Sequence, residues 1–361
     1  MIRPGDRIRA AFEQHRSEPH ISLDQHVRRR RIALGESLVG KLPLYLDTKY
    51  WIVTRDVLLG RRTASAEIEL VEHLLRLARS RRVYCPISET VFLEIMKQED
   101  SATRTRVVEL VDELSLGVTL CPSEERVQTE LAHTFYGFQK GLEILPLALL
   151  VWSRLSYVLG TMHPVQPEFD DQTQLVMQKA FFDHLWDVSL SQMIQTLGED
   201  PFPDDPSEAT AQKLNEGSQA HAHEIRSYKQ AYAAEAAGGV SLLVDTAMQI
   251  LEEIEERVTG SRAPQLESQA AEYRRAIQGL LTGGLCNGKL ALALPTLHVH
   301  TCCHAAARWD KKRKLVGNDL HDFNHAAAAV AYCRGFFTER PLKAMLTQRH
   351  VGLDKLFDCA N

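Results

Sequence analysis

Strand-like and helix-like segments alternate along the first third of this chain, and this alternation limits the folds open to it. Short apolar runs at residues 42–47, 83–87 and 118–121 are expected to form strands. Between them, apolar residues recur at three- and four-residue steps, which indicates helices. Strands that alternate with helices are typical of an α/β fold with a parallel sheet.

The alternation stops in the middle of the chain and returns near its C-terminus. Residues 123–294 show long helical segments and no convincing strand. After them, residues 318–332 predict a helix, 335–338 a strand and 342–346 a short helix, and residues 353–357 are expected to form a last strand that closes the sheet. The predicted organisation is therefore a basic helical arm (1–40), an α/β domain in two pieces (41–122 and 295–361) and an all-α insertion (123–294).

Composition excludes several classes of protein. The longest strongly apolar stretch, residues 144–152, is about half of what a bilayer crossing needs, and the N-terminus lacks the apolar segment of a secretory signal. We therefore expect a cytoplasmic protein without a membrane partner. The seven cysteines are odd in number and irregularly spaced, so they predict no disulfide framework. Cys85, Cys121 and Cys333 lie in apolar runs and are expected to be reduced core thiols.

Acidic residues recur where strands of the predicted sheet end. Asp47 ends the first strand, and Glu94 lies about two helical turns beyond the second. Asp319 and Asp322 are three residues apart on one predicted helix, so they share a face. Glu339 follows the strand at 335–338. Because parallel α/β sheets bind ligands at the carboxyl ends of their strands, these acids are expected to gather at one edge.

Acids gathered in this way repel one another unless a cation lies between them. Oxygen ligands suit Mg²⁺ or Mn²⁺, and such ions can activate water against a phosphodiester. Each acid also has a structural interpretation. Asp47 could cap the following helix, Asp319 or Asp322 could interact with a helix dipole, and Glu94 could be a surface acid.

The ordered set of acids resembles the PIN-like nuclease domains. Leu-Tyr-Leu-Asp47-Thr-Lys-Tyr-Trp is similar to their first strand, and Ser-Glu-Thr-Val-Phe-Leu-Glu94 to their second conserved segment. Asn-Asp319-Leu-His-Asp322, followed by Phe-Phe-Thr-Glu339, resembles their third acid pair and closing strand. The resemblance covers residues 41–122 and 300–361. It implies a PIN-like parallel sheet flanked by helices, and ribonuclease activity that depends on Mg²⁺ or Mn²⁺. The last acid is Glu339, where the family commonly has Asp, and the long insertion is unlike the small toxin members.

Runs of basic residues are candidates for binding the phosphates of a nucleic acid. Residues 28–31 are four arginines. The segment that leads into Asp319 is also basic and contains an aromatic residue that can stack on a base. Its candidate residues are Arg308, Trp309, Lys311, Lys312, Arg313 and Lys314. A solvated loop with Trp309 in the core is the alternative.

Two other kinds of site are suggested by parts of the sequence. His298, His300, Cys302, Cys303 and His304 form a dense cluster in which His300 and His304 share a helical face, as zinc ligands can. No second pair of ligands with matching spacing is evident, so partly buried structural residues are the favoured interpretation. A haloacid-dehalogenase-like phosphatase needs a second Asp two residues after its nucleophile, and this chain has Lys49 there.

The sequence thus predicts a divalent-metal-dependent endoribonuclease. Its catalytic and metal-binding residues are Asp47, Glu94, Asp319 and Asp322, with Glu339 as an additional metal ligand. RNA is expected rather than DNA, although a DNA-directed nuclease of defence or repair would use the same chemistry. A catalytically silent module that binds nucleic acid or protein is the other alternative. Homo-oligomers and control by an antitoxin or another protein partner are both compatible with the sequence.

Overall fold

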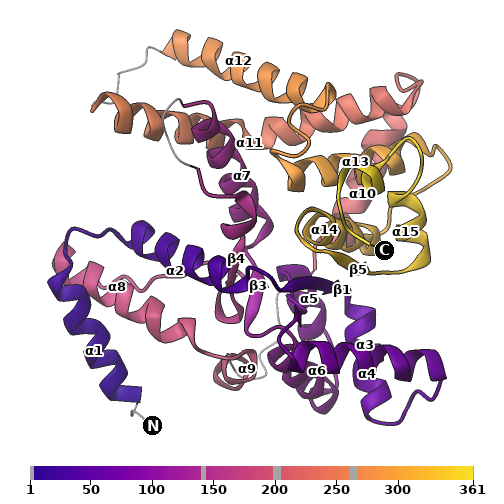
Figure 1. The fold of residues 1–361 in the computed structure, drawn as a ribbon. Helices are drawn as coiled ribbons and strands as arrows, with labels where there is room; N and C mark the ends of the chain where they lie inside the picture. The colour runs from indigo at the N-terminus through magenta and orange to yellow at the C-terminus, as the bar shows by residue number, and fades with distance from the viewer. Residues whose placement is uncertain (1–3, 140–143, 198–204, 261–266, 361) are drawn as a thin grey trace. The chain divides into compact units, whose positions relative to one another are not determined.

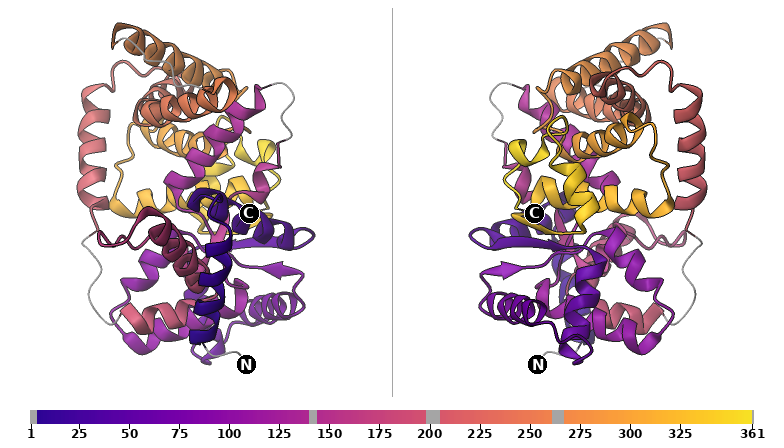
Figure 2. Two further views of the ribbon diagram at one scale, coloured as in Figure 1. Left: turned by 90° about the vertical axis from the view of Figure 1, so that its left-hand side faces the viewer. Right: turned by 90° about the vertical axis from the view of Figure 1, so that its right-hand side faces the viewer.

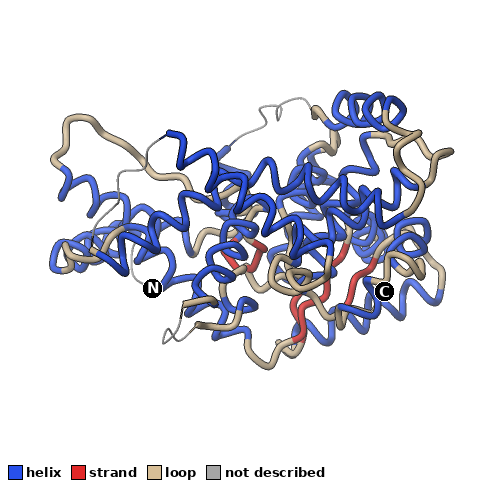
Figure 3. The backbone as a smooth tube through the Cα atoms, turned by 90° about the horizontal axis from the view of Figure 1, so that it is seen from above, coloured by secondary structure: helices blue, strands red, loops and turns tan. Residues whose placement is uncertain are grey.

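The computed structural model describes residues 4–139, 144–197, 205–260 and 267–360, and they group into two units. Unit 1 comprises Met1–Pro122 and Ala148–Phe202, and unit 2 comprises Ser123–Leu147 and Pro203–Asn361. Helices predominate, and the strands are short segments among them (Figure 3). The boundary predicted at residues 122–123 coincides with a boundary between the units. Residues 148–202, assigned from the sequence to the insertion, belong to unit 1.

Unit 1 combines short strands with helices. Its elements, in chain order, are α1 (Pro4–Ser17), α2 (Leu23–Leu38), β1 (Leu42–Leu46), α3 (Thr48–Leu58), α4 (Ser65–Arg79), β2 (Val83–Tyr84), α5 (Glu89–Met96), α6 (Ser101–Leu114), β3 (Val118–Leu120), β4 (Trp152–Arg154), the 3₁₀ turn η2 (Leu155–Tyr157), α8 (Asp171–Trp186) and α9 (Leu190–Leu197). A further 3₁₀ turn, η1 (Leu147–Leu149), lies at the boundary between the units.

The strands of unit 1 pair in sequence order. β1 and β2 are parallel, with Leu42 opposite Val83. Ile87, which follows β2, forms a parallel bridge with Thr119 of β3. β3 and β4 are antiparallel. The α/β character and parallel pairing predicted for residues 41–122 are therefore present, with a second strand that is shorter than expected.

Local signals explain where the helices of unit 1 begin. Asp47, Ser88 and Asp100 are N-caps of α3, α5 and α6, and each side chain accepts a hydrogen bond from a backbone N–H three residues later. The apolar stripe predicted for α4 is buried. The side chains of α5 that face inward include Phe92 and Ile95, which are fully buried. This core fixes the ends of β1 and α5 on which two of the predicted acids lie.

The N-terminal region is helical, as predicted. α1 and α2 both pack against α8, and the contact of α1 with α8 is visible in Figure 1. α2 begins with a capping box in which Ser22 and Gln25 bond each other's backbone N–H. Gly35 of α2 approaches the backbone of Leu149 so closely that a Cβ would lie 2.3 Å from its carbonyl oxygen. This position therefore requires glycine.

Unit 2 is almost entirely helical. Its elements are α7 (Ser123–Gly137), α10 (Ser207–Ala220), α11 (Tyr228–Thr259), α12 (Glu267–Cys286), α13 (Pro295–Trp309), α14 (Gly317–Tyr332), β5 (Gly335–Phe337), α15 (Arg340–Leu346) and α16 (Leu353–Leu356). The 32-residue α11 packs against both α12 and α13, and α13 packs against α14. Figures 1 and 2 show α12, drawn in orange, alongside α11.

Two expectations from the sequence are wrong. β4 lies inside the segment that was predicted to contain no strand. It has three residues at the end of an apolar run, too few to show the alternation that marks a strand. Residues 353–357 were expected to form a closing strand, but Leu353–Leu356 is a helical turn that follows Gly352 in the left-handed region (φ 66°). Instead, Ala360 forms a parallel bridge with Gly335 at the start of β5.

Candidate functional site

Asp47 lies at the junction between the first strand and the first helix of the α/β pattern. β1 ends at Leu46, and Asp47 is the N-cap of α3, where its Oδ1 accepts a hydrogen bond from Tyr50 N at 3.4 Å. The residue is buried, with 6% of its surface exposed. Asp47 is therefore both the acid that follows the first strand and the cap of the next helix, so the two interpretations drawn from the sequence do not exclude each other.

Glu94 is joined to this junction by a hydroxyl group. It lies on α5 and is half-buried. Thr48, which follows Asp47 directly, donates its hydroxyl hydrogen to Glu94 Oε2. This bond connects residues 46 positions apart and joins the Glu94 carboxylate to the first residue of α3, which follows Asp47 in the chain. Carboxylate oxygens are the ligands that Mg²⁺ and Mn²⁺ prefer.

Asp319 and Asp322 lie on α14, in unit 2. Asp319 is buried in the first turn, where its Oδ2 accepts a hydrogen bond from Val316 N at 2.9 Å. Its Oδ1 accepts a hydrogen bond from Arg313 Nη2, so the carboxylate also forms an ion pair. Asp322 is half-buried one turn later on the same helix. Asp319 thus has a structural role at the helix N-terminus, and its charge is already compensated by Arg313.

Glu339, the fifth predicted acid, is exposed. It stands at the N-cap position of α15, shortly after β5, and its side chain makes no capping hydrogen bond. Its position after the strand at 335–337 agrees with the sequence analysis. The structure therefore places Asp47 and Glu94 in unit 1, where Thr48 connects α5 to the residue after Asp47, and places Asp319 and Asp322 on one helix of unit 2.

The six candidate residues of the basic segment differ in their surroundings. The two arginines form ion pairs, Arg308 with Glu235 at 2.8 Å and Arg313 with Asp319. Lys311, Lys312 and Lys314 are exposed, and Trp309, the last residue of α13, is half-buried. The lysines are therefore the members of the segment that present charge to solvent. Of the four arginines at 28–31, Arg30 lies 3.3 Å from Asp183 in an ion pair.

A cavity of about 250 Å³ lies beside this basic segment in unit 2. α10 and the end of α13 form its walls together with the loop at residues 310–315. Its polar lining includes Asn215, Ser218, His304, Lys311 and Lys314. The part contributed by α10 had no signal in the sequence, because α10 is about a hundred residues away from the basic segment.

The His/Cys cluster of α13 consists of buried cysteines and half-buried histidines, all uncharged at pH 7. Burial lowers the pKa of His298 to about 4 and that of His300 to about 3. Burial also raises the pKa of the Cys302 thiol to about 12, so it stays protonated. His298 shares a hydrogen bond of 2.7 Å with the hydroxyl of Tyr232. This environment agrees with the structural interpretation of the cluster. Cys85, Cys121 and Cys333 are buried free thiols, as expected.

The sequence analysis missed a cluster of two histidines and one carboxylate in unit 1. His15 Nε2 and His26 Nε2 lie 2.8 and 3.0 Å from the two carboxylate oxygens of Asp183. Among the described residues, these three side chains, from α1, α2 and α8, lie close enough to one another to hold a metal ion. Arg30 contacts the same carboxylate, however, and its positive charge opposes a cation there. The cluster fixes α1 and α2 to α8.

The pKa values within this cluster follow from the same contacts. Burial alone would raise the pKa of Asp183, but hydrogen bonds from His26 and His15 and the charge of Arg30 lower it overall. Burial lowers the pKa of His15, in spite of its bond to Asp183. No local motif could have revealed this arrangement, because Asp183 is 168 residues from His15.

Glu130 is a second buried acid that the sequence did not reveal. It lies on α7 with no exposed surface and accepts hydrogen bonds from Thr296 N, at the start of α13, and from the Tyr332 hydroxyl. Burial raises the pKa of Glu130 to about 7, although these hydrogen bonds lower it. Its carboxylate therefore accepts a backbone N–H at the start of α13 that has no partner within the helix, and it links α7, α13 and α14.

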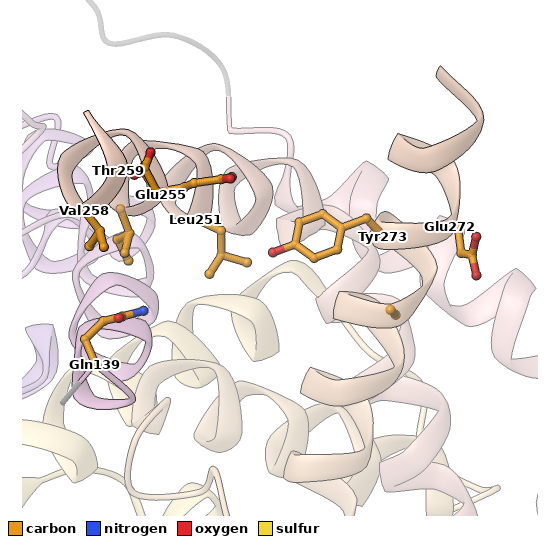
Figure 4. Close-up of a pocket in the computed structure, with 9 residues that line it drawn as sticks. Gln139, Leu251, Glu255, Val258, Thr259, Glu272 and Tyr273 are labelled. Carbon is orange, nitrogen blue, oxygen red and sulfur yellow. The ribbon is translucent and has the colours of Figure 1, made fainter. Parts of the chain in front are cut away.

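A larger hollow of about 800 Å³ lies where α11 and α12 meet the end of α7. Figure 4 shows Leu251 and Val258 of α11, Tyr273 of α12, and Gln139 beyond α7 around it. Its charged lining residues are Glu255 and Glu272. An apolar and acidic lining does not suit a phosphate group, so this hollow does not extend the predicted nucleic-acid site.

Comparisons with known proteins identify no family for this chain. No family model, curated protein or solved structure matches it. Among the described residues, no helix has the length and apolar character needed to cross a membrane.

Proposed function

We propose that the chain is a divalent-metal-dependent nuclease that hydrolyses phosphodiester bonds, with RNA as its expected substrate. The observation that carries the proposal is the hydrogen bond from Thr48 to Glu94, which joins the acid of α5 to the residue that follows Asp47 at the end of β1. The parallel pairing of β1 and β2 supports a site at this end of the strand. The PIN-like resemblance adds Asp319 and Asp322, with Glu339, to the proposed ligand set.

The donor set fits Mg²⁺ or Mn²⁺. Carboxylate oxygens are the ligands such ions prefer, and a bound ion would supply an activated water and offset charge on the phosphate. Asp47 and Glu94 would hold the ion. The Thr48 hydroxyl orients the Glu94 carboxylate, and the buried position of Asp47 restricts its rotation. The exposed lysines at 311–314 would hold the phosphates of the strand.

One observation favours the alternative of a catalytically silent binding module. Arg313 already neutralises Asp319, the first acid of the α14 pair. A carboxylate in an ion pair gains less from a metal ion than a free one, so unit 2 could bind nucleic acid through its lysines without contributing to metal binding. Binding of RNA without cleavage in any divalent metal would favour this alternative.

The experiment that tests the proposal is cleavage by the purified full-length chain. Labelled single-stranded RNA, tRNA, single-stranded DNA and duplex DNA are each incubated with Mn²⁺, with Mg²⁺ and with EDTA. We expect cleavage of RNA that requires the metal and is lost when Asp47 is replaced by Asn. Asn is as good an N-cap as Asp, so this variant keeps the start of α3. Cleavage that persists in EDTA, or in Asp47→Asn, would refute the assignment.

A further inference from the structure

The cavity beside the basic segment has a preformed frame. Asn215 of α10 binds the backbone of Leu315 twice: its Nδ2 donates to Leu315 O at 2.7 Å, and its Oδ1 accepts from Leu315 N at 2.9 Å. Two residues further on, Gly317 N donates to Glu208 Oε2, also on α10, at 2.7 Å. These bonds fix the loop at 310–315 against α10 and so define the shape of the cavity.

Positive charge predominates around the cavity. Arg308, Lys311, Arg313 and Lys314 line it, against two acids, Glu235 and Asp310. Arg308 and Arg313 are occupied by the ion pairs described above. Lys311 and Lys314 form no ion pair with any residue in the described ranges, and both are exposed. The cavity therefore carries two cations that are available to an anion at its mouth.

The rest of the lining is neutral and suits an uncharged, partly polar group. Leu214 and Ala307 contribute apolar surface, and Ser218 and Gln219 contribute hydrogen-bonding groups. His304 is largely buried, and burial lowers its pKa although Glu235 opposes the shift, so its ring is neutral at pH 7. The volume, about 250 Å³, lies below the roughly 300–1,000 Å³ of sites for drug-sized ligands. One small unit fits, and an oligomer does not.

We propose that this cavity binds a single nucleotide, with the nucleoside inside the cavity and the phosphate on Lys311 and Lys314. The inference rests on the proposed function, because the nucleotide would be one unit of the strand that the nuclease cuts. Taking one unit out of a strand into a pocket lets a protein recognise its base. The two lysines would act on the phosphate as point charges.

The test is titration calorimetry of the full-length chain in EDTA with nucleoside 5′-monophosphates, with ribose 5-phosphate and with inorganic phosphate. The variants are Lys311→Gln with Lys314→Gln, and Ser218→Tyr, which fills the cavity from α10 without changing charge. Lys213→Gln is the matched control, because this exposed lysine of α10 does not line the cavity. Circular dichroism confirms that each variant is folded.

We expect the double lysine variant to bind nucleoside monophosphates about tenfold more weakly, Ser218→Tyr to lose binding, and Lys213→Gln to bind like the wild type. Ribose 5-phosphate and phosphate should bind more weakly than the nucleotides. The proposal is overturned if the wild type binds no nucleotide, if phosphate binds as tightly as nucleotides, or if Lys213→Gln has the effect of the double variant. Because no cleavage is measured, failure here leaves the nuclease proposal standing, and the reverse also holds.

Discussion

The two acid pairs of this protein differ in what their carboxylates contact. In unit 1, the Glu94 carboxylate accepts a hydrogen bond from a neutral hydroxyl, that of Thr48, beside Asp47. In unit 2, the Asp319 carboxylate accepts hydrogen bonds from the cationic Arg313 and from a backbone N–H at the start of α14. A hydroxyl orients a carboxylate and leaves its charge in place, whereas a guanidinium group neutralises it.

This difference separates two pairs that looked equivalent in the sequence. Because Arg313 already offsets the charge of Asp319, we expect Asp47 and Glu94 to contribute most to metal binding. Asp319 can contribute fully only if Arg313 moves away from it. Substitutions that remove the charge of Asp47, the hydroxyl of Thr48 or the guanidinium of Arg313 test this difference.

The largest effect is expected at Asp47. Asp47→Asn keeps the N-cap and removes the charge, so metal-dependent RNA cleavage should fall by a factor on the order of 10²–10³ while the unfolding midpoint changes little. The control is Asp100→Asn, which makes the same substitution at the N-cap of α6 in the same unit and should cleave like the wild type. Equal losses in the two variants would show that capping, and not metal binding, is the role of Asp47.

A buried acid outside both pairs, Glu130, shows how strongly burial can raise the pKa of a carboxyl group. The pKa of Glu130 is raised from 4.5 to about 7, so the folded state binds the proton more tightly than the unfolded state. Its stabilising effect is complete below about pH 4.5 and is lost as the pH rises through 7. As the pH rises from below 4.5 to above 7, the unfolding free energy of the wild type should fall by roughly 3 kcal/mol more than that of Glu130→Gln.

Urea denaturation at a series of pH values measures this difference. Glu124→Gln is the control, because Glu124 lies exposed on the same helix and should leave the pH dependence of the wild type unchanged. Parallel stability curves for the wild type and Glu130→Gln would contradict the raised pKa.

The hydroxyl link in unit 1 is expected to have an intermediate effect. Thr48→Val removes the hydrogen bond to Glu94 at constant shape, which should lower the unfolding free energy by about 1 kcal/mol and slow cleavage several-fold. Thr48→Ser should restore both. Thr54→Val, which removes a buried hydroxyl bonded to the Tyr50 carbonyl on the same helix, should reduce stability without a specific loss of cleavage. Normal cleavage by Thr48→Val would remove the main support for pairing Glu94 with Asp47.

The smallest effect is expected at Arg313. Arg313→Gln frees the Asp319 carboxylate, so the Mn²⁺ concentration that gives half-maximal cleavage should fall a few-fold. Arg308→Gln, which breaks the ion pair with Glu235 and leaves Asp319 unchanged, should keep the wild-type value. An unchanged Mn²⁺ requirement in Arg313→Gln would assign Asp319 to the cap of α14 alone.

Features set by neighbouring residues could be predicted from the sequence. The N-cap Ser88, the apolar stripe of α4 and the strand that ends before Asp47 all depend on contacts within a few residues. The strand β4 could not be predicted, because its three residues are paired with β3 more than thirty positions earlier. The residues after Gly352 have a strand-like composition, but a left-handed glycine starts a helical turn there.

The same distinction applies to the candidate sites. Asp47 and Glu94 could be named from their positions after strands, although nothing local showed that Thr48 joins them. Lys311 and Lys314 could be named as basic, but the α10 wall of their cavity could not. His15, His26 and Asp183 meet across more than 150 residues and have no common motif. The sequence therefore identifies the chemical groups, and tertiary contacts decide which of them act together.

Iron-mediated cleavage of the protein itself tests the metal site most directly. Fe²⁺ bound in place of Mg²⁺ generates radicals with ascorbate and peroxide that cut the backbone near the ion, and mass spectrometry locates the cuts. We predict cuts flanking Asp47 and Glu94, and weaker cuts near Asp319 and Asp322, all suppressed by Mn²⁺ and absent in Asp47→Asn. Cuts confined to the surroundings of His15, His26 and Asp183, or cuts that Mn²⁺ does not suppress, would contradict a metal site at Asp47 and Glu94.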